Sequence, residues 1–242
     1  MPRLNKYIAS TGLCSRRKAD EIILEGKVRV NDKQITELGY HVREKDKVFV
    51  DNKLIKPQKG EYYKFYKPAG YITTADDEKN RKTIYNIIPQ ELHHLKPVGR
   101  LDKDSTGLLI MTNDGDFINE MTHPSIKVPK VYMVTINGKF TPEHSEQMYN
   151  GIEIETDAGI KKIAFAETLP VEITNKESLI KVILYQGMNR QIRKMFAQLG
   201  FEVKALKRVQ HATINLEGLK KGQIKPIKPK QIKELNGYLA KL

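Results

Sequence analysis

The sequence predicts an α+β protein with a small N-terminal domain and a larger C-terminal domain. Residues 1–50 contain two short helix patterns and a few short strand patterns. Residues 61–242 contain several separate strand patterns, and their helix patterns lie mostly towards the end. The intervening residues 51–60 are polar and include Pro57 and Gly60, which is typical of a linker. A chain of 242 residues is long enough for one small and one medium domain.

The N-terminal domain is predicted to begin with two helices. Leu4 and Ile8 fall at helical spacing in the first helix. Ser15 is a good N-cap for the second helix, which we expect to end at Gly26. Residues 27–31 and 48–50 then alternate as half-buried strands do. Helices and strands are thus mixed within about 50 residues.

The first turn of the second helix carries Arg16, Arg17 and Lys18. Cations at this end oppose the helix dipole, at a cost of about 0.3–1 kcal/mol each when exposed. A phosphate would supply the missing negative charge and would accept hydrogen bonds from the free backbone N–H groups. The run is therefore either an ordinary solvated surface or a phosphate site, and the sequence leaves both interpretations open.

In the larger domain, β-prone segments predict strands at residues 62–66, 108–111, 130–136, 151–156 and 179–185. A short helix is expected at residues 83–88, turns at 67–70 and 112–115, and a charged loop at 76–82. The residues from 201 onward are strongly basic, and we predict a basic tail that includes Lys204, Lys207 and Arg208. A short terminal helix at residues 231–241 is expected to dock on the domain.

A helix is predicted from Asn189, as its N-cap, to Gly200. At 100° per residue, one apolar stripe forms along it, from Ile192, Met195, Phe196 and Leu199. Arg190 and Lys194 lie opposite the stripe, facing solvent or phosphate. Arg193 lies at the stripe's edge, where a partly buried guanidinium usually needs a carboxylate partner.

A charged loop bounded by glycines precedes the strand at 108–111 and holds Asp102 and Asp104 between Arg100 and Lys103. A rigid strand after the loop would hold its carboxylates firmly while leaving them accessible. From spacing alone, the loop is equally a solvated turn with local ion pairs. Either aspartate is a candidate for chemistry at this stage.

The charge distribution favours a polyanionic partner. The net charge is +13, with a surplus of +6 in residues 1–60, none in 61–200 and +7 in 201–242. Two basic ends suggest two surfaces that contact nucleic acid. The sequence has no apolar run near the roughly 20 residues that cross a bilayer, and no signal-peptide core. We therefore expect a cytoplasmic protein without membrane contact, and its single cysteine, Cys14, agrees with a reducing compartment.

No cofactor or metal is predicted. The sequence contains neither a phosphate-cradling G-x-x-x-x-G-K loop nor a dinucleotide fingerprint. The pair His93-His94 invites a metal hypothesis, but adjacent residues point in different directions on a helix or a strand. No other Cys or His residues have ligand spacing.

Three motifs of the larger domain resemble those of RNA pseudouridine synthases of the RsuA/RluB/RluF type. They are Gly99-Arg-Leu-Asp-Lys-Asp-Ser-Thr-Gly-Leu-Leu, Lys67-Pro-Ala-Gly-Tyr-Ile-Thr-Thr and the segment around Gln191-Ile192-Arg193. The resemblance implies a mixed, mainly antiparallel catalytic sheet, with Asp102 rather than Asp104 as the catalytic carboxylate. It also implies that Arg193 pairs with that aspartate. The segment 189–193 looks more like the large-subunit rRNA and tRNA branch (RluF-like, then RluB-like) than the small-subunit branch.

Tyr132 shares a strand face with Val134 and Ile136, so spacing alone makes a core tyrosine as plausible as a site residue. In the resembled family, a tyrosine of a Lys-x-Tyr strand packs against the target base, and Lys130-Val131-Tyr132 fits that pattern. An aromatic face is a suitable stacking platform for an unstacked uracil. The resemblance therefore implies that Tyr132 contacts the base.

Residues 1–50 resemble the αL RNA-binding module. The similar segments are Arg3-Leu-Asn-Lys-Tyr-Ile, Cys14-Ser-Arg-Arg-Lys-Ala and Gly26-Lys-Val-Arg-Val-Asn. This resemblance implies RNA binding and says nothing about chemistry. The residues predicted to contact RNA across both domains are Arg3, Lys6, Ser15, Arg16, Arg17, Lys18, Lys27, Asn31, Arg100, Asn189, Arg190 and Lys194.

Together the patterns predict an enzyme that converts uridine to pseudouridine in structured RNA, chiefly 23S ribosomal RNA with tRNA as a further candidate, and that acts as a monomer. Two other classes stay open. A non-catalytic RNA-binding assembly factor would bind equally well with Asp102→Asn. An RNA methyltransferase would also carry an αL module, but it should show a Gly-rich loop for the methyl donor after a strand.

Overall fold

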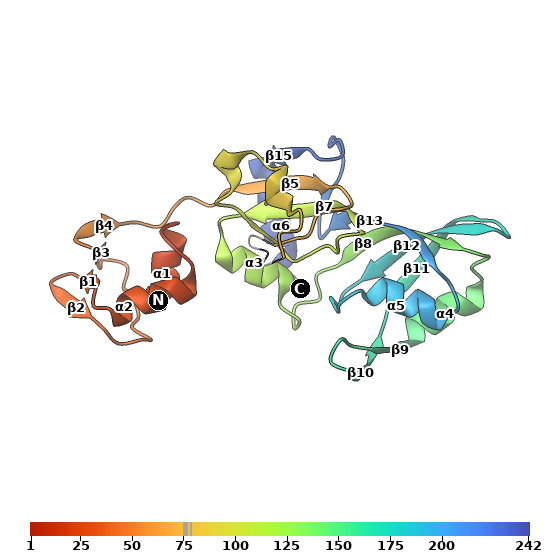
Figure 1. Cartoon of the computed structure of the whole chain (residues 1–242), viewed down its shortest axis with the longest axis horizontal. Helices are drawn as coiled ribbons and strands as arrows, with labels where there is room; N and C mark the ends of the chain where they lie inside the picture. The colour runs from red at the N-terminus through yellow and green to blue at the C-terminus, as the bar shows by residue number, and fades with distance from the viewer. Residues whose placement is uncertain (75–76, 78) are drawn as a thin grey trace. The chain divides into compact units, whose positions relative to one another are not determined.

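The computed structural model describes residues 1–74, 77 and 79–242. It divides into two compact units, which we describe separately (Figure 1). Residues 1–61 and 113–115 form the small unit, and residues 62–112 and 116–242 form the large unit. Within the described ranges, no helix has the length and apolar character needed to cross a membrane.

The small unit packs two helices against a four-stranded antiparallel sheet. The helices are α1 (Leu4–Ser10) and α2 (Arg16–Leu24). The strand order is β2-β1-β3-β4, with bounds β1 Val28–Val30, β2 Lys33–Ile35, β3 Val48–Val50 and β4 Lys53–Ile55. Apolar side chains from both helices and the sheet form one core. As predicted, the Ser15 side chain caps α2, and it accepts a hydrogen bond from the backbone N–H of Lys18 at 3.2 Å.

The structure shortens the predicted linker at residues 51–60, because β4 occupies residues 53–55 of that segment. Asp51 and Asn52 both have positive φ angles, 47° and 61°. Two such residues are typical of the tight turns that join antiparallel strands. The Asp51-Asn52 turn therefore folds the chain back beside β3 and extends the small sheet by one strand.

The large unit is built on a mixed, mainly antiparallel sheet, as predicted. Its main order is β11-β12-β8-β13-β7-β5-β15, and only the β13–β7 pairing is parallel. The strands of this sheet are β5 Tyr62–Lys67, β6 Lys96–Pro97, β7 Thr106–Thr112, β8 Lys130–Asn137, β11 Glu167–Ile173, β12 Glu177–Leu184, β13 Val203–His211, β14 Ile214–Asn215 and β15 Ile224–Pro226. A separate hairpin joins β9 (Ile152–Glu155) and β10 (Lys161–Ala164).

The helices of the large unit cover the two ends of this sheet (Figure 1). α4 (Pro142–Asn150) and α5 (Gln191–Gln198) lie beside β8, β11 and β12. α3 (Gly115–Thr122) and α6 (Pro229–Leu239) pack with β7 in a second core. Two short 3-10 helices, Ile84–Asn86 and Gln90–Leu92, complete the unit.

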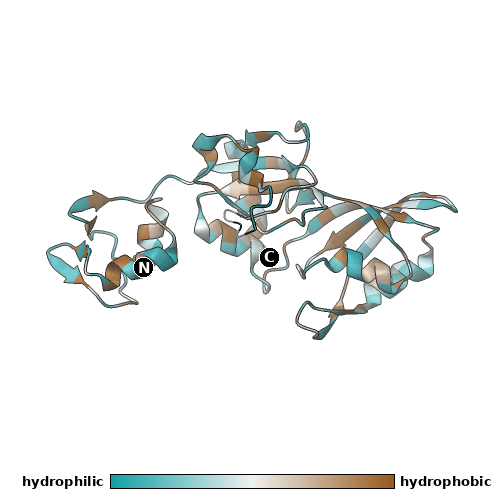
Figure 2. Cartoon of the chain, in the orientation of Figure 1, coloured by the Kyte–Doolittle hydropathy of each residue, from teal (hydrophilic) through white to brown (hydrophobic). Residues whose placement is uncertain are grey.

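β7 joins the two cores because its side chains alternate between the sheet faces. Leu108 and Ile110 belong to the core with α3 and α6, whereas Leu109 and Met111 belong to the core with α4 and α5. Alternating hydrophobic and polar residues are visible along the strands of this unit (Figure 2). The loop that carries Asp102 is therefore attached to a strand that is buried on both faces.

Several elements differ from the sequence predictions. The turn expected at 112–115 leads directly into α3, and the helix expected at 83–88 is a single 3-10 turn. The terminal helix begins two residues earlier than predicted, but its Leu235 and Leu239 are buried, so it docks as expected. In the predicted loop 76–82, residues 76 and 78 lie outside the described residues, and the others form no helix or strand.

The largest correction concerns the predicted basic tail. Residues 203–211 form β13, which lies between β8 and β7 in the middle of the sheet. Its Arg208 is only 2% exposed. Basic residues in this strand look like a solvated tail in the sequence because the pairing partners that bury them are more than 70 residues away.

Candidate active site

A cavity of about 630 Å³ opens in the large unit where the Gly99–Ser105 loop, β8, β13 and the start of α5 meet. Within the described part of the chain, Asp102 is the only carboxylate that lines it. Five cationic side chains also line it: Arg100, Lys130, Lys162, Arg190 and Arg208. The cavity therefore suits an anionic ligand with one reactive carboxylate inside it.

Lys67, which is fully buried at the end of β5, holds the Asp102 loop in place. Lys67 Nζ donates hydrogen bonds to the backbone carbonyls of Asp102 and Ser105, both at 2.9 Å, and to that of Pro68 at 3.1 Å. Burial lowers the pKa of Lys67 to about 8, although the charges of Asp102 and Asp104 oppose this shift. These bonds fix the backbone of the loop and leave the Asp102 side chain one-third exposed.

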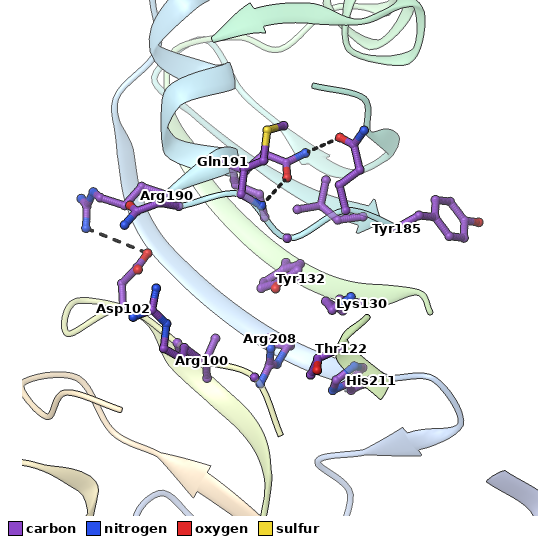
Figure 3. Close-up of a pocket in the computed structure, with 18 of the residues that line it drawn as sticks. Arg100, Asp102, Thr122, Lys130, Tyr132, Tyr185, Arg190, Gln191, Arg208 and His211 are labelled. Atoms are coloured by element: carbon purple, nitrogen blue, oxygen red, sulfur yellow. Dashed lines mark hydrogen bonds and ion pairs between the residues drawn. The ribbon is translucent and has the colours of Figure 1, made fainter. Parts of the chain in front are cut away.

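Arg193 pairs with Asp104, whereas the resemblance implies that it pairs with Asp102. Arg193 Nε lies 3.2 Å from Asp104 Oδ2 rather than beside Asp102, and Arg193 Nη1 donates to the Val203 carbonyl at 2.9 Å. Arg190 donates two hydrogen bonds to Asp104, and its Nη1 lies 4.0 Å from Asp102 Oδ2 (Figure 3). Because the Val203 carbonyl anchors Arg193, its guanidinium reaches Asp104.

Asp104 is the carboxylate that this arginine pair holds ionised. Burial opposes its ionisation, but the hydrogen bond from Arg190 and the charges of Arg193 and Arg190 outweigh this effect and lower its pKa. Both Asp104 oxygens are occupied by Arg190. Asp104 does not line the cavity, so the geometry separates the two candidates left open by spacing: Asp102 faces the cavity and Asp104 fixes the arginines.

The start of α5 also differs from the prediction. Asn189 lines the cavity but is not the N-cap; Arg190 occupies that position with a left-handed φ of 51°. The Gln191 side chain accepts a hydrogen bond from the Met188 backbone N–H at 3.2 Å and so supports the turn into the helix. The left-handed backbone conformation of Arg190 turns the chain into the helix, and the Arg190 side chain reaches Asp104 and the cavity.

The apolar stripe of α5 is confirmed. Ile192, Met195 and Phe196 are buried in the core, and Leu199 packs against it. Lys194 pairs with Asp157 at 2.8 Å and does not line the cavity, so the structure does not bring it to the candidate site.

Tyr132 lines the cavity, yet it is only 8% exposed and belongs to the hydrophobic core. It is therefore both a core tyrosine and a residue of the candidate site. Its antiparallel partner on β13 is Arg208. Figure 3 shows Tyr132 between Gln191 and Arg190 on one side and Arg208, Thr122 and His211 on the other. The aromatic ring therefore belongs to the wall of the cavity.

The sequence analysis assigned no site role to Lys67, Lys130, Arg208 or His211. The only sequence signal for Arg208 was the alternation of Leu206 and Arg208 with Lys207, which is short and which the basic composition obscured. Burial, reinforced by Arg208, lowers the pKa of Lys130 to about 8. Burial, with the charges of Arg208 and Lys130, also lowers the pKa of His211.

The predicted RNA-contacting residues of the small unit are mostly at its surface. Arg3, Ser15, Arg16, Arg17, Lys18, Lys27 and Asn31 are exposed, and Lys6 is half-buried. Lys18 and Lys27 form ion pairs with Glu21 and Glu25. The Asn31 side chain bonds to Asp46 and to the Lys47 backbone, so it stabilises a turn. In the large unit, Arg100 is exposed at the rim of the cavity.

Among the described residues, no group of three or more His, Cys, Asp and Glu side chains is arranged to hold a metal ion. His93 and His94 each bond to a nearby backbone carbonyl, from Ile88 and Glu91 respectively.

The site thus has a partly exposed aspartate, on the loop before the buried strand β7, in a basic cavity that an aromatic ring also lines. This arrangement suits an enzyme that modifies nucleic acid, and the comparisons with known families agree. The family model described as RNA pseudouridylate synthase matches residues 61–198, and the S4 domain model matches residues 2–48. The chain belongs to the RNA pseudouridine synthase family and carries an N-terminal S4 domain, which confirms both resemblances. It is therefore an isomerase, not a methyltransferase or a binding-only factor.

Relatives of both types named in the sequence prediction, RluF-like and RluB-like, are similar to this chain. Ribosomal large subunit pseudouridine synthase B of Bacillus subtilis is 40% identical over 97% of this chain and 96% of its own. The dual-specificity RNA pseudouridine synthase RluF of Escherichia coli is 36% identical over 91% of this chain and 73% of its own. A solved structure described as a pseudouridylate synthase has a TM-score of 0.69 and 26% identity, and the match covers 97% of this chain and all of that one.

Proposed function

We propose that this enzyme isomerises uridine in large-subunit ribosomal RNA, with tRNA as a further substrate, and that Asp102 is its catalytic carboxylate. The observation that carries the proposal is that Asp102 is the only carboxylate among the described residues that line the cavity, which also include Tyr132 and Arg190. The substrate class is supported by the name of the Bacillus subtilis relative, which is a ribosomal large subunit pseudouridine synthase, and the second substrate by the name of RluF, which is a dual-specificity RNA pseudouridine synthase.

The reaction breaks the bond between the sugar C1′ and the base N1, turns the base, and forms a bond between C1′ and C5. The proton at C5 is lost and a ring nitrogen gains one, so the composition is unchanged. A partly exposed carboxylate such as Asp102 attacks the nucleoside or stabilises its charged intermediate. Both routes need a carboxylate within reach of the bound nucleoside, and Asp102 satisfies this from its loop.

Tyr132 holds the base in this proposal. Its side chain lines the cavity and packs among core residues, so its orientation is fixed before RNA binds. A fixed aromatic face stacks on an extruded uracil, and a uridine inside a paired stem must be extruded to reach it. Stacking also retains the free base while it turns.

Arg190 and Arg193 contribute positive charge near the two loop aspartates in this proposal. Arg190 Nη1 lies 4.0 Å from the Asp102 carboxylate and Arg190 also lines the cavity, so it contacts the carboxylate and the RNA strand. Arg193 acts as a positioning residue, because it fixes Asp104 and thereby the loop and the start of α5. Arg100 and Asn189, which line the same cavity, contact the RNA around the target, and the exposed basic residues of the small unit bind a second part of the RNA.

The proposal is tested by pseudouridine mapping of total ribosomal RNA and tRNA. Cells that lack the gene are compared with cells given back the wild type or Asp102→Asn. The proposal predicts a site in large-subunit ribosomal RNA that disappears and returns only with the wild type. A site restored equally by Asp102→Asn contradicts the catalytic assignment, and the absence of any lost site contradicts the substrate assignment. The proposal also locates the enzyme in the cytoplasm with its RNA, which cell fractionation tests.

A further inference from the structure

The register of β8 and β13 places four side chains on one face of the sheet, at the cavity. Tyr132 is paired directly with Arg208, and Lys130 is paired with His211. Residues directly opposite in an antiparallel pair share a face, about 5 Å apart. Arg208 and His211 are three positions apart, so a regular strand would point their side chains to opposite faces. An irregularity between Arg208 and Gln210 shifts the register by one residue, and both side chains therefore face the cavity.

These groups bring more positive charge into the cavity floor than the protein neutralises. Arg208 is 2% exposed, and its Nε donates to the Leu108 carbonyl at 2.7 Å. One of its terminal nitrogens, Nη2, is buried without a hydrogen-bond partner. Lys130 Nζ donates to the Val128 carbonyl at 3.0 Å. Neither cation forms an ion pair among the described residues, and the lining carboxylate, Asp102, lies beside Arg190.

A buried guanidinium with an unused donor is costly unless a ligand completes its bonding. Burial is the main cause of the lowered pKa values of Lys130 and His211, and the positive charge of Arg208 lowers both further. Thr122 and His123, at the end of α3, line the same part of the cavity and add no negative charge. An anion would relieve the repulsion, and arginine is especially suited to phosphate because it presents paired N–H donors.

We propose that Lys130, Arg208 and His211 form a subsite for one backbone phosphodiester of the RNA strand, next to the uridine held at Tyr132. This inference rests on the proposed function, because an extruded nucleotide brings its flanking phosphates into the cavity with it. The direct pairing of Tyr132 with Arg208 places base and phosphate on neighbouring strands. The subsite thus anchors the strand on the side of the cavity away from Arg190 (Figure 3).

The test removes the negative charge of one phosphate at a time. An RNA stem-loop containing the uridine found by mapping is synthesised with a neutral methylphosphonate at each linkage around the target. Dissociation constants are measured for the full chain carrying Asp102→Asn, which prevents turnover. We expect one flanking methylphosphonate to weaken binding about tenfold or more, because it removes a charge-assisted contact. In Asp102→Asn/Arg208→Gln, the same substitution should change binding less than twofold.

The matched control is Lys204→Gln, which removes a charge from the exposed part of the same strand, where Lys204 pairs with Glu177. It should retain the full effect of the critical methylphosphonate. Because Arg208 is buried, its substitution could destabilise the chain, so thermal unfolding is compared among the variants. Lys130 is less buried than Arg208, and Lys130→Gln should also reduce the effect of the critical methylphosphonate.

Three outcomes overturn the proposal. The first is equal sensitivity to methylphosphonates with and without Arg208 and Lys130. In the second outcome, inorganic phosphate competes with RNA only when Arg208 is present, but no methylphosphonate weakens RNA binding. The subsite would then bind free phosphate and not the RNA backbone. In both cases RNA still binds and the proposed function stands. The third is failure of the parent chain to bind the mapped RNA, which overturns the proposed function as well.

Discussion

Arg193 pairs with Asp104, with Nε 3.2 Å from Oδ2, while Arg190 bridges Asp104 and the neighbourhood of Asp102. The two arginines therefore contact different groups, although they are only three residues apart in the sequence. Arg193 is one-sixth exposed and bonded to a backbone carbonyl, whereas Arg190 is nearly half exposed.

This difference predicts opposite balances of stability and activity. Arg193→Gln should lower the free energy of unfolding by about 1.5–3 kcal/mol, because a charged hydrogen-bond donor is lost in a partly buried place. Arg190→Gln should change it by less than about 1 kcal/mol, since its ion pairs are exposed. It should nevertheless lower kcat by about 100-fold, because it removes a cation that lies 4.0 Å from the reacting carboxylate. Denaturant unfolding and single-turnover kinetics measure both quantities; equal stability losses would contradict the assignment.

Lys130 predicts a pH dependence of RNA binding. Its pKa is lowered to about 8, with Arg208 and His211 facing it from β13, so its side chain is charged below pH 8 and neutral above. If it contacts a phosphate, RNA affinity should fall by up to about tenfold as the pH rises from 8 to 9. Lys130→Arg stays charged and should bind with little change over this range. A pH dependence that persists in Lys130→Arg would point to another group, such as Lys67.

Gly107 predicts a strict requirement for glycine where β7 meets β13. It has a φ of 117°, and an added Cβ would lie 2.2 Å from the Arg208 carbonyl oxygen. Gly107→Ala should therefore destabilise the large unit by about 2–5 kcal/mol through backbone strain and overpacking. Gly115→Ala is the matched control: nothing lies within 4 Å of a Cβ there, and the change should be neutral or slightly stabilising. Thermal unfolding of both variants decides the matter.

Arg16 and Arg17 predict the salt dependence of binding by the small unit. Both are exposed in the first turn of α2, where phosphate contacts are favourable. In Arg16→Gln/Arg17→Gln, RNA binding should weaken, and the slope of log K against log salt should become shallower by about 1.5. The control, Lys45→Gln/Lys47→Gln, removes the same charge from exposed positions of the same unit. An equal loss of slope in the control would mean that the α2 end is not a distinct phosphate site.

The sequence predicted local features well where a short segment determines them. The Ser15 cap, the apolar stripe of α5 and the strand around Tyr132 each depend on residues within one or two turns or on strict alternation. The loop with Asp102 was located for the same reason, since its glycines and charges are contiguous.

Features determined by distant partners were missed. Arg208 looks solvated in the sequence, and only its pairing with β8 and β7 buries it. The pairing of Arg193 with Asp104 depends on the Val203 carbonyl, and the left-handed Arg190 displaced the cap expected at Asn189. The strand β4, after the tight turn at Asp51-Asn52, has only three residues and too little pattern to predict, so its residues were assigned to the linker.

The most direct test of the account compares the two loop aspartates. Single-turnover conversion of the mapped RNA is measured for the wild type, Asp102→Asn and Asp104→Asn, with binding measured in parallel. Asp102→Asn should retain RNA binding and lose conversion by more than about 1,000-fold, because the reacting carboxylate is gone. Asp104→Asn should lose about 10- to 100-fold, since it only loosens the positioning of the arginines and the loop. Conversion that survives in Asp102→Asn but is abolished in Asp104→Asn would contradict the central claim.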